Sequence, residues 1–358
     1  MYKRILVINP FGIGDVLFTT PLVRAIEEAN PHSFIGYWCN ERVRSILEGN
    51  KNIDRIFALS RGDLKKVFCR SWLAGIAAFL KLFSEIKGCK FEAAFDFSLD
   101  HRYGLVAKLA GIKTRIGYNY KGRGRFLTDR ITLDGYRGRH AVDYYNALLK
   151  FAGLSLKNSG LDLPVSGENL KRAQELLRSR GIKSGDLVIG IAPGAGGSWG
   201  RDAVYKHWPA LKFAQVVDRL VKDYSAKVLL LGDESEREIA DIVSGAALHK
   251  PVDLVGKTSL EILTGVIKNL NLFICNDGGP LHMAVALGVK TVSIFGPVDE
   301  TVYGPYPPSP LHKVLKWDLS CRPCYMNFRM PPCEKERECL KSISVEQVME
   351  AVKEVLSR

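Results

Sequence analysis

Short apolar runs alternate with helical patterns along the whole chain. Runs of four to six apolar residues are typical of buried strands, and the segments between them repeat apolar residues at spacings of three and four, as amphipathic helices do. The expected strands are residues 4–8, 34–38, 55–58, 93–96, 187–192, 227–231, 272–275 and 291–295. Strands that alternate with helices indicate an α/β fold in which a parallel sheet is covered by helices on both faces.

The pattern lapses at residues 154–167, where Ser, Asn, Gly and Pro prevail. We place a linker there, which gives an N-terminal domain of residues 1–160, a C-terminal domain of residues 161–343 and a last helix over 344–358. Two domains agree with a length of 358 residues, because domains average about 150 residues. Ser344 followed by Gln347 predicts a capping box at the start of the last helix.

The composition is that of a folded, water-soluble chain, with 46% hydrophobic and 25% charged residues. The longest apolar stretch covers residues 72–80, whereas a membrane-spanning helix needs about 20 residues. The first apolar run covers only residues 5–8, which predicts a strand and not a signal peptide. We therefore expect a cytoplasmic protein.

Positive charge is concentrated in one half of the chain. Residues 1–157 carry 26 Lys and Arg against 14 Asp and Glu, while the remaining residues carry 25 against 24. This asymmetry favours an acidic partner for the first half, such as nucleic acid, anionic lipid or a phosphorylated glycan. A solubility device remains an alternative explanation.

Residues 70–83 form an amphipathic pattern with two interpretations. One helical face would carry Trp72, Leu73, Ile76, Phe79, Leu80 and Phe83, with Arg70 and Lys81 nearby. Such a face suits a helix lying on a membrane surface. It suits a buried core helix equally well.

The segment 9–15 follows the first strand and contains two glycines, but the dinucleotide fingerprint G-x-G-x-x-G fails because Leu17 replaces its third glycine. The segment still brings the Asp15 carboxylate to the mouth of a strand, where it could accept a proton from a hydroxyl. The alternative is that Asp15 only caps the helix over 16–29, which we expect Pro21 to interrupt or restart.

Two glycine turns of the second half follow strands and carry groups that could bind parts of a nucleotide. The turn at Gly194 follows a strand, and Lys206 adds a positive charge near the next helix, as a pyrophosphate would require. Another strand ends before Glu234, whose carboxylate could hold a ribose. An ordinary glycine loop and a solvated helix end are the alternatives at these two places.

The most specific segment covers residues 276–284. Asp277 precedes Gly278 and Gly279, and Pro280 then opens a helix whose first turn contains His282. Glycines followed by a helix start create an anion site from backbone N–H groups. A histidine that only packs in the core is the alternative for His282.

Four of the eight cysteines lie close together near the C-terminus. They are Cys321, Cys324, Cys333 and Cys339, and the spacing C-x-x-C of the first pair is typical of a metal knuckle. The wider spacing of the second pair leaves four free thiols as the alternative. A bound zinc or iron would be structural, because four thiolates fill the coordination sphere.

These motifs together resemble glycosyltransferase family 9, the ADP-heptose:lipopolysaccharide heptosyltransferases. The matching segments, in the expected order, are residues 12–16, 19–21, 206–209, 276–282, 286–288 and 295–297. The resemblance implies a GT-B architecture, with two Rossmann-like domains facing a central cleft and the last helix packing back toward the N-terminal domain. It also implies inverting transfer that needs no cofactor.

The resemblance further assigns roles to individual residues. Asp15 would be the general base, and Lys206 would neutralise the diphosphate leaving group. The residues implied in donor binding are Gly194, Glu234, Asp277, Gly278, Gly279, Pro280 and His282. The residues expected to bind the acceptor are Gly14, Thr19, Arg102, Lys121, Arg123 and Arg125.

The expected reaction moves heptose from ADP-heptose to a Kdo or heptose hydroxyl of a lipopolysaccharide inner core. The phosphates and carboxylates of such an acceptor would explain the basic first half, and peripheral contact with the inner membrane surface follows from the same reasoning. We expect no nucleic-acid partner. The alternatives are a GT-B nucleotide-sugar epimerase or hydrolase, and a non-catalytic protein that binds anionic lipid or nucleic acid.

Overall fold

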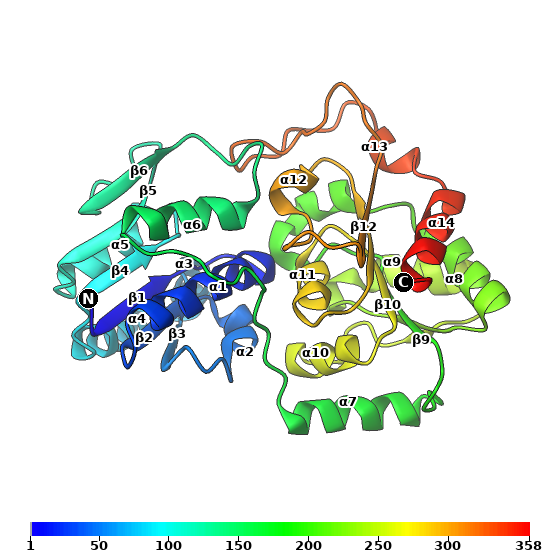
Figure 1. Cartoon of the computed structure of the whole chain (residues 1–358), viewed down its shortest axis with the longest axis horizontal. Helices are drawn as coiled ribbons and strands as arrows, with labels where there is room; N and C mark the ends of the chain where they lie inside the picture. The colour runs from blue at the N-terminus through cyan, green and yellow to red at the C-terminus, as the bar shows by residue number, and fades with distance from the viewer. Residues whose placement is uncertain (1) are drawn as a thin grey trace. The chain divides into compact units, whose positions relative to one another are not determined.

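The computed structural model describes residues 2–358, which divide into two compact units, unit 1 up to Pro164 and unit 2 from Val165. The division lies within the linker expected at 154–167. Each unit contains one six-stranded parallel sheet flanked by helices (Figure 1). The α/β fold class expected from the sequence is therefore confirmed.

Unit 1 has the strand order β3-β2-β1-β4-β5-β6, the order of a Rossmann fold. Its elements are β1 (Arg4–Ile8), α1 (Ile13–Ala29), β2 (Phe34–Cys39), the 3-10 turn η1 (Glu41–Val43), α2 (Arg44–Leu47), β3 (Arg55–Ala58), α3 (Arg61–Arg70), α4 (Trp72–Gly88), β4 (Ala93–Asp96), α5 (His101–Leu109), β5 (Thr114–Tyr120), β6 (Asp129–Leu133) and α6 (Ala141–Phe151).

Unit 2 repeats this order as β12-β11-β10-β7-β8-β9. Its elements are α7 (Gly167–Ser179), β7 (Val188–Ala192), the 3-10 segment η2 (Gly197–Lys206), α8 (Ala210–Tyr224), β8 (Lys227–Leu230), the 3-10 turn η3 (Glu234–Glu236), α9 (Arg237–Ala246), β9 (Val252–Asp253), α10 (Leu260–Lys268), β10 (Leu272–Asn276), α11 (Gly279–Ala286), β11 (Thr291–Phe295), α12 (Glu300–Tyr303), β12 (His312–Lys316), α13 (Glu338–Lys341) and α14 (Val345–Leu356).

Eight of the twelve strands in the described residues match the sequence prediction, and β5, β6, β9 and β12 were missed. β6, β9 and β12 end their sheets, and their side chains are largely half-buried or exposed. Edge strands need less apolar surface than central strands, so their sequences lack a clear hydrophobic run.

Pro21 does not interrupt the first helix, which corrects the sequence prediction. α1 runs unbroken from Ile13 to Ala29. A proline in a helix leaves the carbonyl four residues earlier without its backbone donor. Here that carbonyl is Leu17 O, and the Thr20 hydroxyl donates to it over 2.7 Å.

The last helix begins at the predicted capping box, in which the side chains of Ser344 and Gln347 each bond the other's backbone. Its apolar face, including Val348 and Val352, is buried in the core of unit 2 together with residues of α8. This apolar face of α14 therefore belongs to the core of unit 2.

The linker is fastened to unit 1 by Arg24 and Thr20 of α1. The Arg24 guanidinium on α1 forms an ion pair with Asp162 at 2.5 Å and donates to Gly160 O at 2.7 Å. The Thr20 hydroxyl accepts from the backbone N–H of Asp162. These contacts hold residues 158–162 on α1.

Candidate functional site

The sheet order of unit 1 places the β1 and β4 carboxyl ends at a topological switch point. The chain leaves β1 toward one side of the sheet and leaves β4 toward the other, which opens a crevice where ligands of such sheets bind. Asp15 lies here, half-buried in the first turn of α1. The Asn9 side chain, at the end of β1, donates to Asp15 O over 3.0 Å and fixes this turn.

The Asp15 carboxylate faces a buried tyrosine of α6. The Tyr145 hydroxyl donates to Asp15 Oδ1 over 3.4 Å, and Tyr145 is 1% exposed. Burial, followed by the negative charge of Asp15, raises the pKa of neighbouring Tyr136 well above its ordinary value. Gly12 is the N-cap of α1, so the alternative that Asp15 only caps this helix is wrong.

Two expected acceptor residues share α1 with Asp15 but differ in their surroundings. Gly14 directly precedes Asp15 and is half-buried. Thr19 is fully buried, donates its hydroxyl to Val16 O and lies 2.5 Å from the Tyr37 hydroxyl. The Thr19 side chain therefore joins α1 to β2 inside unit 1.

The expected cations come from the next two strands along the same edge of the sheet. Arg102 lies in the first turn of α5 after β4, and its Nε is 3.2 Å from Asp100 Oδ1. Lys121, Arg123 and Arg125 are exposed on the loop after β5. Because β1, β4 and β5 are neighbouring parallel strands, these groups and Asp15 all lie beyond one sheet edge.

Sequence reasoning missed Asp96, the last residue of β4. Burial raises its pKa to about 6, although bonds from Ser98 oppose the shift. Its Oδ1 accepts from the Ser98 backbone N–H at 2.8 Å. The signal available was an acidic residue that ends a fully buried strand beside β1.

In unit 2 the switch point lies between β7 and β10 and contains a buried ion pair. Lys206 Nζ, at the end of η2, is 2.7 Å from Asp277 Oδ2, directly after β10. The two side chains are 6% and 5% exposed. Lys206 Nζ also lies 3.7 Å from the centroid of the Trp199 ring. The structure thus joins two residues that the sequence assigned to the same ligand.

Two polar residues bind the loop after β7. The Asn276 amide donates to Pro193 O and Gly194 O, and its oxygen accepts from the backbone N–H of Trp208. The buried Glu236 carboxylate accepts from Gly196 N at 2.8 Å. A Cβ at Gly194 would lie 1.7 Å from Glu236 Oε1, so a side chain there would displace the Glu236 carboxylate.

Glu236 was not singled out from the sequence. Glu236 and Asp233 form a capping box, and their spacing of three residues is a recognisable sequence signal for it. Burial raises the pKa of Glu236, while backbone N–H groups of Gly196 and Asp233 oppose the shift. Because a carboxylate already uses the Gly196 N–H, this loop has fewer N–H groups for a phosphate than the sequence suggested.

The start of α11 is the remaining anion-binding element of this switch point. Gly278 is its N-cap, Gly279 and Pro280 open its first turn, and His282 is buried there. Glu234 is exposed in the segment after β8. Its carboxylate lies next to Gly256, where an added Cβ would collide with it. Backbone N–H groups at a helix start favour a negative ligand.

The four clustered cysteines line one pocket of unit 2. Burial, followed by the negative charge of Cys321, raises the pKa of the Cys324 thiol to about 11. In the described part of the chain, however, no three His, Cys, Asp or Glu side chains are arranged to hold a metal ion. The thiols suit a thiophilic metal chemically, but their arrangement does not form a coordination sphere.

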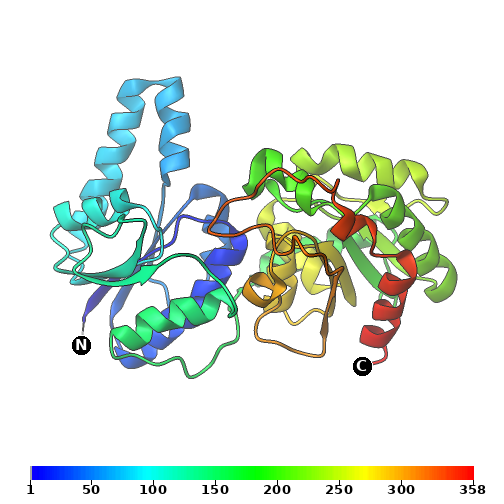
Figure 2. The ribbon, with the colours of Figure 1, turned by 90° about the horizontal axis from the view of Figure 1, so that it is seen from above.

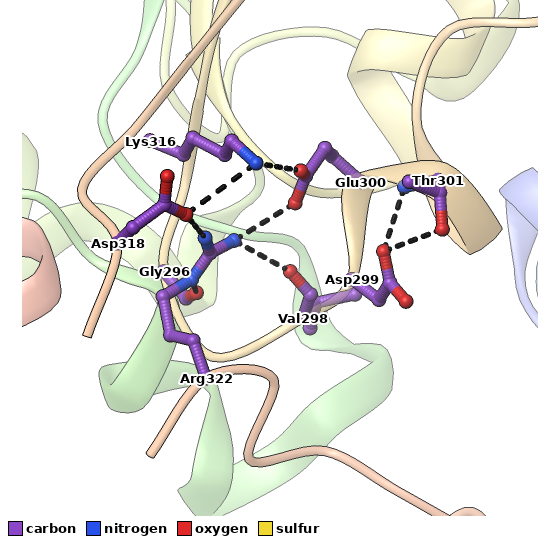
Figure 3. Close-up of polar contacts among 8 residues, drawn as sticks. All are labelled: Gly296, Val298, Asp299, Glu300, Thr301, Lys316, Asp318 and Arg322. Atoms are coloured by element: carbon purple, nitrogen blue, oxygen red, sulfur yellow. Dashed lines mark hydrogen bonds and ion pairs between the residues drawn. The ribbon is translucent and has the colours of Figure 1, made fainter. Parts of the chain in front are cut away.

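Arg322, between the first two cysteines, fixes this segment to the turn after β11. Its guanidinium donates to Gly296 O and Val298 O and pairs with Glu300 at 2.9 Å (Figure 3). Burial of Glu300 would raise the pKa of its carboxyl, but Lys316 and Arg322 outweigh burial and lower it. The cysteine segment is thereby anchored independently of any metal.

Comparison with known proteins supports one family. Residues 79–331 match the model for glycosyltransferase family 9 (heptosyltransferase). Lipooligosaccharide heptosyltransferase 2 of Campylobacter jejuni is 30% identical over 240 residues, which cover 66% of this chain and 69% of that protein.

Solved structures of similar fold cover nearly the whole chain. A glycosyltransferase family 9 protein from Veillonella parvula has a TM-score of 0.83 and 28% identity, covering 99% of this chain and 97% of that one. The Escherichia coli heptosyltransferase WaaC with ADP-2-deoxy-2-fluoro heptose has a TM-score of 0.70 and 18% identity, covering 98% and 99%. These likenesses place both units in one known two-sheet architecture.

Proposed function

Because the chain belongs to glycosyltransferase family 9, the heptosyltransferases, we propose that it transfers heptose from ADP-heptose to a hydroxyl of a lipopolysaccharide inner core. The acceptor sugar is Kdo or heptose, and transfer inverts the configuration of the anomeric carbon of the transferred heptose. The observation that carries this proposal is the position of Asp15, half-buried at the switch point of unit 1 with its carboxylate against Tyr145.

Asp15 accepts the proton of the acceptor hydroxyl as its oxygen bonds to the anomeric carbon. The bond between that carbon and the diphosphate breaks, and ADP leaves with the bonding electrons. Lys206 and the N–H groups at the start of α11 stabilise the charge that develops on the diphosphate. Since these groups are fixed in place, we propose that transfer requires no metal, and that EDTA leaves turnover unchanged.

Exposed cations are suited to an anionic acceptor. Lys121, Arg123 and Arg125 follow β5 on the same sheet edge as Asp15, and Arg102 follows β4. Phosphates and carboxylates of an inner core would pair with them. The structure of Escherichia coli WaaC with ADP-2-deoxy-2-fluoro heptose supports ADP-heptose as the donor of this chain.

We propose that the protein works in the cytoplasm, at the inner membrane surface. All eight cysteines are unpaired, as expected in a reducing compartment. Within residues 2–358, no helix is both long and apolar enough to cross a membrane. A lipid-linked acceptor would bring the enzyme to the bilayer as a peripheral protein.

We further propose a structural zinc or iron ion at Cys321, Cys324, Cys333 and Cys339. The shared pocket and the thiolate chemistry support it, and closing the site requires the thiols to approach one another. Elemental analysis of purified protein should find about one metal ion per chain, and none in a Cys324→Ser variant. Metal-free wild-type protein would refute the site.

The function is tested by ADP release from ADP-heptose, with and without a heptose-deficient Kdo–lipid A acceptor. We expect release with acceptor, abolished in Asp15→Ala while ADP-heptose binding persists, and unchanged in the control Asp134→Ala, an exposed aspartate of unit 1. Release without acceptor would favour the epimerase or hydrolase alternative. Near-normal turnover of Asp15→Ala would refute the general base.

A further inference from the structure

Helices α3 and α4 form a hairpin that is rooted in unit 1 at one end only. The later turns of α4 bury Leu82 and Ile86 in the core beside the sheet. Among residues of its first half, only Gly75 is buried, and α3 has no buried residue. The two helices lie side by side and extend away from the sheet (Figure 2).

The hairpin is held together by its own contacts. The Phe68 ring packs on Gly75, where an added Cβ would lie 2.3 Å from the ring. Ser71 forms the turn, and its hydroxyl accepts from the Ala74 N–H as the N-cap of α4. The hairpin therefore has a defined tip at residues 70–72.

Large apolar side chains are exposed at this tip and along α4. Trp72 is 69% exposed, Leu73 is 74% exposed, and Leu80, two turns further, is 56% exposed. Leu73 and Leu80 are seven residues apart, so they share one face of the helix. The core-helix interpretation of this segment therefore fails for its first half. Clustered exposed apolar groups mark an interaction surface.

In the same part of the hairpin, every charged side chain is basic. Lys65, Lys66, Arg70 and Lys81 are exposed, and residues 64–84 contain no Asp or Glu. None of these four cations forms an ion pair within the part of the chain that the structure describes. The two acidic residues of the hairpin lie at its base and are engaged there, because Asp63 belongs to the capping box of α3 and Glu85 pairs with Arg55.

We propose that this hairpin docks the protein on an anionic lipid bilayer. Trp72 and Leu73 enter the interface between headgroups and acyl chains, where tryptophan is favoured, and the lysines and arginine contact acidic headgroups. Each cation near an anionic surface strengthens binding several-fold. A nucleic acid would match the charge but leave the apolar tip without a partner.

The test is co-sedimentation of the full chain with vesicles of phosphatidylcholine alone and of phosphatidylcholine mixed with phosphatidylglycerol. We expect binding to the acidic vesicles that falls as salt rises. Trp72→Ser/Leu73→Ser should weaken it at least about tenfold, and so should Lys65→Glu/Lys66→Glu. Leu248→Ser removes a leucine of unit 2 that is 85% exposed, and this variant should bind as wild type does.

Two outcomes would overturn the proposal. Equal binding by Trp72→Ser/Leu73→Ser and Leu248→Ser would exclude the tip as the docking site. A concentration-dependent dimer that this double variant abolishes, without vesicle binding by wild type, would assign the surface to a second copy. The proposal is independent of the transferase reaction, because vesicle binding is measured without donor or acceptor and unfolding temperatures verify that each variant folds.

Discussion

The ammonium of Lys206 lies 2.7 Å from a carboxylate oxygen of Asp277, and both side chains are almost completely buried. The pair joins the segment after β7 to the segment after β10, the two strands that flank the switch point of unit 2. A buried charge is stable only while its partner is present. An anionic ligand that reaches Lys206 must therefore share this cation with Asp277.

Removing only one member of this pair should destabilise the protein. We expect Lys206→Met to lower the free energy of unfolding by about 3–5 kcal/mol, because Asp277 stays buried without a cation. Lys206→Met/Asp277→Asn should recover much of that loss. Urea denaturation measures both, and Arg172→Met, which removes the exposed partner of Glu168, should cost less than about 1 kcal/mol. Additive losses in the double variant would show that the pair is not coupled.

Tyr145 should act as a positioning residue for the Asp15 carboxylate. Tyr145→Phe removes the hydroxyl that donates to Asp15 Oδ1 and keeps the buried ring. We expect kcat to fall about threefold to tenfold. The acid limb of the kcat/KM profile should move to higher pH, because the ionised carboxylate loses a donor.

A purely structural role for Tyr145 would lower stability without moving the pH profile. Tyr144→Phe is the matched control, since its hydroxyl contacts the backbone of Arg137 and not Asp15. An unchanged acid limb in Tyr145→Phe would contradict the positioning role.

Asp96 should make folding less favourable at high pH. Its pKa is about 6 in the folded protein and near 3.8 when unfolded, so the unfolded chain loses this proton first as pH rises. Stability from this group is then present below about pH 4 and is lost as pH rises through 6. Asp96→Asn should raise the free energy of unfolding by about 2–3 kcal/mol at pH 8 and change it little at pH 4.

Urea denaturation at both pH values tests this expectation. The Asn oxygen can still accept from the Ser98 N–H, so the substitution removes the charge and leaves the turn intact. An equal gain at both pH values would exclude titration of Asp96 as the cause.

Sequence patterns predicted the parts of the fold that hydrophobic burial determines. The central strands β1, β4, β7 and β10 consist mostly of buried apolar residues, and each was located within one residue. β6 and β12 were missed because edge strands with polar residues lack that signal. Where α1 continues through Pro21, the Thr20 hydroxyl donates to the Leu17 carbonyl, a contact that a propensity argument does not include.

The site was predictable where glycines and charges follow strands. The contact between Lys206 and Asp277 was not, because they are 71 positions apart and only the sheet order brings them together. The capping box with Asp233 marks Glu236 locally, but it does not predict the contact of Glu236 with Gly196, 40 positions away. Its role appears only when the Gly194 loop is folded against it.

Gly278 should be replaceable by no other residue without loss of donor binding. Its φ of 175° is accessible to any residue, so the obstacle is space: a Cβ would lie 2.7 Å from the carbonyl oxygen of Ala195. A backbone carbonyl cannot rotate away as a side chain does, so Gly278→Ala must move the start of α11 away from the loop after β7. We expect ADP affinity to fall about tenfold and stability by about 1–3 kcal/mol, measured by calorimetric titration and thermal unfolding.

Gly167→Ala, whose Cβ would meet nothing within 4 Å at the start of α7, should leave both unchanged. If Gly278→Ala bound ADP as the wild type does, the start of α11 would not be the diphosphate site.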